Sequence, residues 1–591
     1  MSASTPASTG GAGATPPTLL EAFATSAAAL RHFGIPRIRV VGLSDGCTQD
    51  DHARQRIKPD GKDFDTLLQE SARRCPHQAL GTASHRICSG QDAARAVTAN
   101  QEAPIVTEQE FMHKFVFHSR PCVILDALEG WPALQRWRDD RHVFDLDHAL
   151  PPEAETESMG DEGGDTDEEE EEEEGDTAAS RTASVTLGRK KVTVALTPNG
   201  RADAVARVTY ATDAVPVEEA ATVYAGAEAQ RHAVLLPRVG HTSANGAAAE
   251  AVRREKLFMC AAELRVTLPQ LYGLLQRTPV RAPANPTEVD MREYADQQRA
   301  PAIAYAQLQN NCLNTEYRHL HADLSTNVER FGCRVFDQAA VEAANVWFGV
   351  PASVSSLHQD WVENLYSVVR GVKEFVLLPP WEGPFIPKPD IPAAAFAIDE
   401  AASHMDPDDD RAETWTLQFK QYPVKDGTVV PWMDFDLAGA DVEGDAAAAA
   451  RAVLESRLLE KHLVRQSVSA LSPPGVGTRK PLDDGDDTAA AAAAAAREEA
   501  AMKPLHPLVA YVHPGETLYL PAMWLHRVAQ HADSTDLHAR AEHHAAAAAG
   551  GAATPSSPPP PLPLVAAVNY WYDMSFNNPS VVLLREFGLL L

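Results

Sequence analysis

The 591-residue chain has a formal net charge of −30, of which an acidic run over residues 161–176 supplies −12, leaving −18 for the rest. No clustered Lys and Arg for phosphate contacts accompany that acidic balance, which argues against direct nucleic-acid binding. No secretory signal or apolar stretch long enough to span a bilayer is found, so we expect no membrane association and a cytoplasmic location, with the nucleus as an additional one. The seven cysteines lack Cys-x-x-Cys spacing, and we expect reduced thiols rather than a zinc site around Cys47, Cys75 and Cys88.

Residues 17–300 are predicted to form an N-terminal α+β extension behind a disordered segment, 1–16. Capping boxes at Thr18 and Thr107 predict the starts of two helices. Three further elements follow in the extension: a strand at Cys122–Leu125, a helix over EGWPALQRW and an alternating strand over VTVALTPNG (192–200).

Residues 301–591 are predicted to form a strand-rich core. Six short segments rich in β-branched and aromatic residues favour a sandwich or barrel over βαβ units: 345–350, 365–370, 373–378, 508–512, 517–525 and 566–572. The expected fold class is therefore mainly β, with helical segments on the N-terminal side.

Five segments of biased or aperiodic composition are predicted to be inserts that loop out of these two parts. Twelve of the sixteen residues in 161–176 are acidic, and alanine fills 488–496, so neither segment can form a packed core. The inserts are expected near 45–104, 150–184, 211–253, 438–505 and 532–563.

The triplet His358-Gln-Asp360 is the candidate metal motif. Side chains two apart on a strand share a face, so the imidazole and the carboxylate would point at the same place. This supplies two of the three ligands of the 2-His-1-carboxylate arrangement that holds non-haem Fe(II). The triplet recurs at three other places, but only His358 precedes two apolar strands, expected as a hairpin: the others are His321/Asp323, His404/Asp406 and His531/Asp533.

A lysine and a third histidine complete the candidate site. Lys373 would share a strand face with Phe375 and Leu377, and a buried ammonium costs several kcal/mol unless an anion pairs with it. A small dicarboxylate would supply that anion; the alternative is a lysine that snorkels out to solvent. His526, expected at the end of the apolar strand 517–525, is the preferred third ligand over His513, which lies in an outward-pointing turn, although a structural core histidine remains an alternative.

The run NVWFGVPASVSSLHQDWVENLYSVVRGVKEFVLLPPW resembles the core of the JmjC (cupin-like) Fe(II)/2-oxoglutarate-dependent oxygenases. GETLYLPAMWLHRV and VNYWYDM resemble the two closing strands of that family. RPCVILDALEGWPALQRW, VTVALTPNGRADAV and AYAQLQNNCL resemble consecutive segments of its lysyl hydroxylases, so the resemblance covers about residues 105–591. It implies a double-stranded β-helix (jelly-roll) core over 301–591.

The resemblance also implies the residues of the site. Fe(II) would be held by His358, Asp360 and His526. The cosubstrate 2-oxoglutarate would contact Lys373, the hydroxyls of Tyr305 and Ser355, and the amides of Asn364 and Asn569, with O₂ as the third reactant. Relatives often carry threonine at the position of Ser355, and a histidine at that of Arg527.

The activity that the resemblance implies is carbon hydroxylation of a lysine side chain in a protein, with a developmentally regulated GTP-binding protein as the expected partner. Relatives form dimers through C-terminal helices, so a homodimer is a further expectation, and the apolar tail 581–591 would pack on its own domain or on a partner. Three alternatives remain open: demethylation of histone lysine or arginine, endopeptidase action on histone tails, and a cupin-like binding module without turnover. The complete set of three ligands and a lysine argues against the last.

Overall fold

The computed structural model of the chain describes residues 35–43, 48–51, 103–146, 191–212, 251–283, 285–294, 302–380, 383, 388–423, 428–433, 508–548 and 560–575. The helix predicted at Thr18, the acidic run, the insert 438–505, the tail 581–591 and the cysteines considered for zinc lie outside these residues. None of the described helices is long and apolar enough to cross a membrane.

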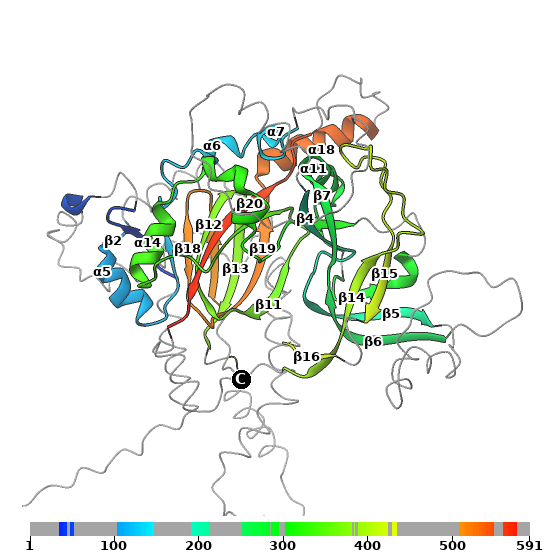
Figure 1. Ribbon diagram of the computed structural model, residues 1–591, viewed down its shortest axis with the longest axis horizontal. Coiled ribbons are helices and arrows are strands. Elements are labelled where there is room, and N and C mark those ends of the chain that lie inside the picture. The colour runs from blue at the N-terminus through cyan, green and yellow to red at the C-terminus, as the bar shows by residue number, and fades with distance from the viewer. Residues whose placement is uncertain are drawn as a thin grey trace, which may run out of the picture.

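Two β-sheets form the centre of the molecule (Figure 1). The larger sheet has seven strands in the order β10 (Ala343–Gly349), β20 (Val565–Asp573), β12 (Val362–Arg370), β18 (Thr517–Leu520), β3 (Cys122–Ile124), β1 (Arg37–Val40) and β2 (Ile105–Val106). The smaller sheet has four antiparallel strands in the order β11 (Ser355–Gln359), β19 (Leu525–His531), β13 (Val372–Leu378) and β17 (Leu508–Val512). Apolar side chains of both sheets, such as Tyr366 and Phe375, belong to one buried cluster, so the sheets pack face to face as in a jelly roll.

Two further sheets flank this centre. One has the order β15 (Phe419–Pro423), β14 (Asp390–Ile398), β6 (Ala251–Cys260), β5 (Ala204–Thr212) and β8 (Glu288–Asp290), with β16 (Val429–Pro431) paired to β14. The other consists of β7 (Ala262–Thr267), β4 (Lys191–Thr197) and β9 (Ile303–Tyr305). Because β14 pairs with β6, segments from either side of residue 301 share one sheet.

Short helices surround the sheets. They are α5 (Glu108–Phe111), the π-helical turn η1 (Met112–Val116), α6 (Ala133–Arg136), α7 (Asp140–Val143), α11 (Leu268–Arg277), α12 (Met291–Tyr294), α13 (Cys312–Thr315), the 3₁₀ helix η2 (Arg318–Asp323), α14 (Asn327–Val335) and α18 (Ser534–Ala548). The capping box predicted at Thr107 is confirmed: its side chain accepts from the Glu110 backbone N–H while the Glu110 side chain returns to the Thr107 N–H.

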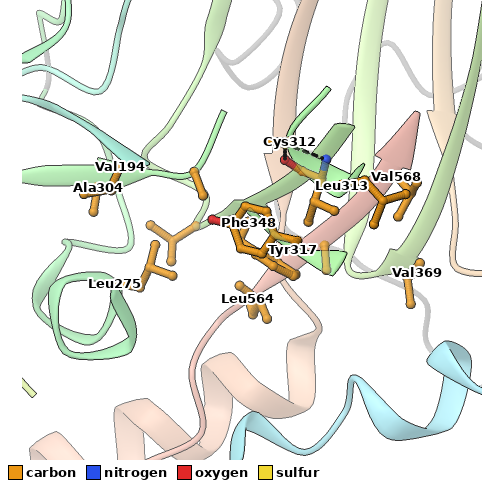
Figure 2. Close-up of a cluster of buried hydrophobic side chains, with 14 of the residues drawn as sticks. Val194, Leu275, Ala304, Cys312, Leu313, Tyr317, Phe348, Val369, Leu564 and Val568 are labelled. Carbon is orange, nitrogen blue, oxygen red and sulfur yellow. Dashed lines mark hydrogen bonds between the residues drawn. The ribbon is translucent and has the colours of Figure 1, made fainter. Parts of the chain in front are cut away.

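A buried cluster joins the extension to the larger sheet (Figure 2). In it, Phe348 of β10 lies against Tyr317, with ring centroids 5.7 Å apart, and both are almost fully buried. The backbone of Ala306 pairs with that of Phe348, N–H to carbonyl at 2.9 Å. This contact fixes β9, and hence Tyr305, beside the jelly roll.

The hairpin predicted after His358 does not form. The strands β12 and β13 follow one another but pair with other partners, β12 with β18 and β20 and β13 with β17 and β19. Gly371 makes the crossing with φ +70°, and a Cβ there would lie 2.9 Å from the carbonyl oxygen of His531. The chain thus passes from one sheet to the other, a connection that alternating hydrophobicity does not reveal.

The strand predicted over 517–525 is two strands. β18 ends at Leu520, Pro521 follows, and Met523 adopts φ +69° before β19 begins at Leu525. His526 therefore lies at the start of a strand in the smaller sheet and not at the end of a strand in the larger one. Proline lacks a backbone N–H donor, which accounts for the break.

The insert predicted near 532–563 is partly packed against the core. It contains α18, whose Arg540 donates to the side chain and the backbone carbonyl of Gln276, and its last residues include the fully buried Leu562. Arg370, 4% exposed, holds this segment by donating to Asp140 at 2.7 Å, to Asp536 at 3.0 Å and to the Leu562 carbonyl at 2.9 Å.

Replacing Arg370 by methionine is expected to lower the free energy of unfolding by about 3–5 kcal/mol, because it leaves two carboxylates without their buried partner. Urea unfolding followed by circular dichroism measures this change. Arg334→Met is the control, because Arg334 pairs with Glu108 while half exposed, and surface pairs contribute at most about 1 kcal/mol. Equal losses in the two variants would contradict the role assigned to Arg370.

Candidate metal and cosubstrate site

Two neighbouring strands bring the three candidate ligands together. His358 on β11 and His526 on β19 are directly paired residues of the smaller sheet, although 168 positions apart in the sequence. Asp360 follows β11, and its carbonyl accepts from the Met523 backbone N–H at 2.8 Å, which ties it to the turn before β19. One ligand atom from each of the three lies within 4.8 Å of the others. The Asp360 Oδ2 atom is 3.9 Å from His358 Nε2 and 3.5 Å from His526 Nε2.

The backbone sets the tautomer of both imidazoles. His358 Nδ1 lies 2.7 Å from the carbonyl oxygen of Ser356, and His526 Nδ1 lies 3.0 Å from that of Trp524. A carbonyl can only accept, so each Nδ1 carries the proton and each Nε2 presents a lone pair towards Asp360. Such orientation by an outer hydrogen bond is typical of histidines that bind metals. The three residues therefore fit a divalent ion.

His526 is held in its neutral form. Burial is the main cause that lowers its pKa to about 4; the nearby His358 adds to the effect, and Asp360 and the Trp524 carbonyl oppose it. A neutral imidazole is the form that binds metal, so protons compete little for this ligand at neutral pH.

The same shift predicts a pH dependence of stability for the metal-free protein. In the unfolded chain His526 takes up a proton below its usual pKa of about 6.5, whereas the folded chain does not do so until about pH 4. The unfolding free energy should therefore fall as pH falls through this window, by about 2 kcal/mol at pH 5 from this residue. Urea unfolding in chelator at pH 7 and pH 5 tests it, with His526→Gln as the reference variant. A pH dependence that is the same in both proteins would contradict the prediction.

Lys373 lies in the interior, as predicted, and the alternative of a solvent-exposed lysine is wrong. It is 0% exposed, and Phe375 and Leu377 of its strand belong to the apolar cluster between the sheets. Its Nζ donates to Gln530 Oε1 at 2.6 Å and to Tyr305 Oη at 3.1 Å, both neutral groups. Burial without an anion lowers its pKa to about 7. This buried amine, unmatched by a carboxylate among the described residues, fits a ligand that brings one.

A cavity of about 320 Å³ opens beside the three candidate ligands. Tyr305, Ser355 and Asn364 line it together with the triad, and Tyr305 is hydrogen-bonded to Ser355. Lys373 lies behind Tyr305, one hydrogen bond away from the cavity.

Asn569 differs from the prediction, because it does not line the cavity. It is fully buried, and its side chain accepts from Trp347 Nε1 at 2.8 Å and donates to Asn364 at 3.3 Å. Asn569 lies on β20, between β10 and β12, and its amide holds two wall residues in place.

Two kinds of site residue were missed from the sequence. Gln530 shares a face of β19 with His526, and besides accepting from Lys373 it donates to the carbonyls of Val350 and Ser353; period-2 spacing from His526 could have indicated it. Asp203, Phe258 and Trp432 line the cavity from the sheet outside the jelly roll, and no local pattern connects them to His358.

The other His-x-Asp triplets serve the fold. Asp323 accepts hydrogen bonds from Arg136, Trp137 and His142. His404 is exposed and pairs through its backbone with Thr416, and His531 lies 2.8 Å from Glu374. Within the described part of the chain, the group formed by His358, Asp360 and His526 is the one set of such side chains close enough to hold an ion.

A family model described as a cupin-like domain matches residues 108–578 of the chain. The chain belongs to the cupin-like family. This membership and the strand-rich structure confirm the predicted jelly-roll core.

Among curated proteins, JmjC domain-containing protein E of Dictyostelium discoideum is 29% identical over 272 residues, 46% of this chain and 54% of that protein, so the match spans about half of that relative. Lysine-specific demethylase JMJ32 of Arabidopsis thaliana is 24% identical over 482 residues, 81% of each chain. Bifunctional peptidase and (3S)-lysyl hydroxylase JMJD7 of Homo sapiens is 24% identical over 340 residues, 57% of this chain and 67% of that protein. The chain is thus similar, at 24–29% identity, to proteins named for a JmjC domain, a lysine demethylase and a lysyl hydroxylase.

Proposed function

We propose that the protein is an Fe(II)- and 2-oxoglutarate-dependent oxygenase that hydroxylates a lysine side chain of a protein substrate. The observation that carries the proposal is the arrangement of His358, Asp360 and His526, whose ligand atoms lie within 4.8 Å of one another, with the Nδ1 atoms of both imidazoles hydrogen-bonded to backbone carbonyls and their Nε2 atoms left free for a metal. This donor set, two imidazoles and one carboxylate, suits Fe(II) and leaves positions open for cosubstrate and O₂.

Each residue of the candidate site has a definable task in this proposal. The triad would hold Fe(II), which together with 2-oxoglutarate and O₂ supplies the oxidising power for inserting oxygen into a C–H bond. Lys373 would pair with the distal carboxylate of 2-oxoglutarate, and the hydroxyls of Tyr305 and Ser355 would donate to it. Gln530 holds the Lys373 amine in position.

Support for lysine as the target comes from the relatives, one of which is named a lysyl hydroxylase and another a lysine-specific demethylase. Lysine demethylation is the second candidate function, because the match to the relative named a demethylase covers 81% of the chain. The relative named a lysyl hydroxylase is also named a peptidase, but the triad of His358, Asp360 and His526 suggests redox chemistry rather than peptide hydrolysis. A developmentally regulated GTP-binding protein as partner stays a prediction.

The products separate these candidates. Full-length protein is incubated with Fe(II), 2-oxoglutarate and candidate GTP-binding proteins or methylated histone peptides, and substrate mass and succinate are measured. A gain of about 16 Da indicates hydroxylation, a loss of about 14 Da demethylation, and backbone fragments peptidase action. The absence of succinate under all conditions would refute the oxygenase proposal.

A further inference from the structure

Part of the cavity wall comes from outside the jelly roll. Asp203 immediately precedes β5, Phe258 lies on β6, and Trp432 immediately follows β16. The rings of Phe258 and Trp432 are 4.7 Å apart between centroids. The carbonyl of Asp203 accepts from Ser356 Oγ at 2.8 Å, which fixes this residue against the strand that carries His358.

The described side chains that line the cavity carry more negative than positive charge. They include two carboxylates, Asp203 and Asp360, and no lysine or arginine. If the proposed function is correct, the positive charges of a divalent ion and of protonated Lys373 equal the negative charges of Asp360 and of the dicarboxylate cosubstrate, so these four groups are neutral together. Asp203 then remains as a carboxylate without a counter-charge in the cavity, and a cationic group of the substrate would lower its electrostatic energy.

The position of Asp203 suits contact with a ligand. Asp203 is exposed, and its backbone adopts φ +50°. Desolvation raises the pKa of its carboxyl group, whereas a hydrogen bond with Cys260 and the nearby His358 lower it, so a cationic ligand would stabilise the charged form. The adjacent Phe258 and Trp432 rings offer an apolar surface on which the methylene groups of a long side chain can pack, and their faces attract a cation.

We propose that Asp203, with the Phe258–Trp432 pair, is the substrate-specificity site that receives the cationic side chain of a peptide. The Asp203 carboxylate pairs with the alkylammonium group, and the two rings pack against the methylenes that precede it. The inference rests on the proposed function for the placement of the metal and the cosubstrate, and it adds the residue that selects a charged side chain.

Equilibrium binding tests this assignment without turnover. Immobilised full-length protein is loaded anaerobically with Fe(II) and 2-oxoglutarate and offered two nine-residue peptide libraries, one with lysine at the centre and one with norleucine, which keeps the methylenes and lacks the charge. We expect the wild type to retain the lysine library at least about tenfold better, and Asp203→Asn to lose this preference. The matched control is Asp337→Asn, the same change at an exposed aspartate that also has a left-handed backbone, φ +55°.

Each outcome decides the assignment. A wild type without a preference for lysine overturns it, whether or not the Asp203 variant folds, and so does a folded Asp203→Asn protein that keeps the preference. Succinate formed in air, with each library, with the candidate substrates named above and without peptide, is measured in parallel on the wild type. If the wild type forms no succinate under any of these conditions but its preference for lysine depends on Asp203, the oxygenase proposal is refuted and the binding site is supported. If it forms succinate but its preference for lysine does not depend on Asp203, the oxygenase proposal is supported and the binding site is refuted.

Discussion

Replacing His358 by alanine is expected to weaken Fe(II) binding at least about 100-fold and to reduce succinate formation to background. The imidazole supplies one of three ligand atoms, and its Nε2 is directed at the others by the hydrogen bond from Nδ1 to the Ser356 carbonyl. Loss of an outer hydrogen-bond partner alone costs about 10–100-fold in metal affinity, so loss of the ligand itself should cost more. Anaerobic titration with Fe(II), followed by calorimetry, measures the affinity.

His404→Ala is the matched control for this prediction. His404 belongs to a second His-x-Asp triplet, is exposed, and pairs with Thr416 only through its backbone. Its replacement should leave metal affinity and succinate formation within about twofold of the wild type. If the His358 variant bound Fe(II) as tightly as the His404 variant, the metal centre would have to be sought elsewhere in the chain.

Local patterns predicted the strands well. Five of the six predicted core segments are present as β10, β12, β13, β17 and β20 with bounds that differ by at most three residues. Alternation and β-branched composition act within one strand, so they can be read from a single segment. The same holds for Lys373, whose interior position follows from its sharing a face with Phe375 and Leu377.

Pairing between distant segments could not be predicted in this way. The separation of β12 from β13 depends on partners as distant in the sequence as β20, and the helix α18 lies within a segment that was expected to loop out. The wall residue Phe258 faces the cavity because β6 pairs with β14, which is more than 130 residues later. His526 was chosen as the third ligand from its expected place at a strand end, and the family resemblance supported the choice, but only the register of β11 against β19 shows how it meets His358.

Replacing Lys373 by methionine is expected to weaken 2-oxoglutarate binding at least about 100-fold while metal affinity stays within about threefold. Methionine keeps an unbranched apolar chain of similar length but cannot pair with a carboxylate, and loss of one partner of a buried charge pair costs about 3–5 kcal/mol. Anaerobic calorimetric titration of the metal-loaded protein with 2-oxoglutarate measures the change. Lys420→Met is the control, because Lys420 is a partly buried strand lysine that pairs with Asp399 in the flanking sheet.

The buried amine also predicts that the cosubstrate binds together with a proton. Burial lowers the pKa of Lys373 to about 7 in the free protein, so at pH 8 most of the amine is neutral. A carboxylate beside it favours the charged form and raises the pKa again, so binding at pH 8 should take up about one proton, and at pH 6 almost none. Affinity for 2-oxoglutarate should consequently decline as pH rises above 7. Titrations in two buffers of different ionisation enthalpy give the proton count directly, and a count of zero at pH 8 in the wild type would mean that the distal carboxylate pairs with a group other than Lys373.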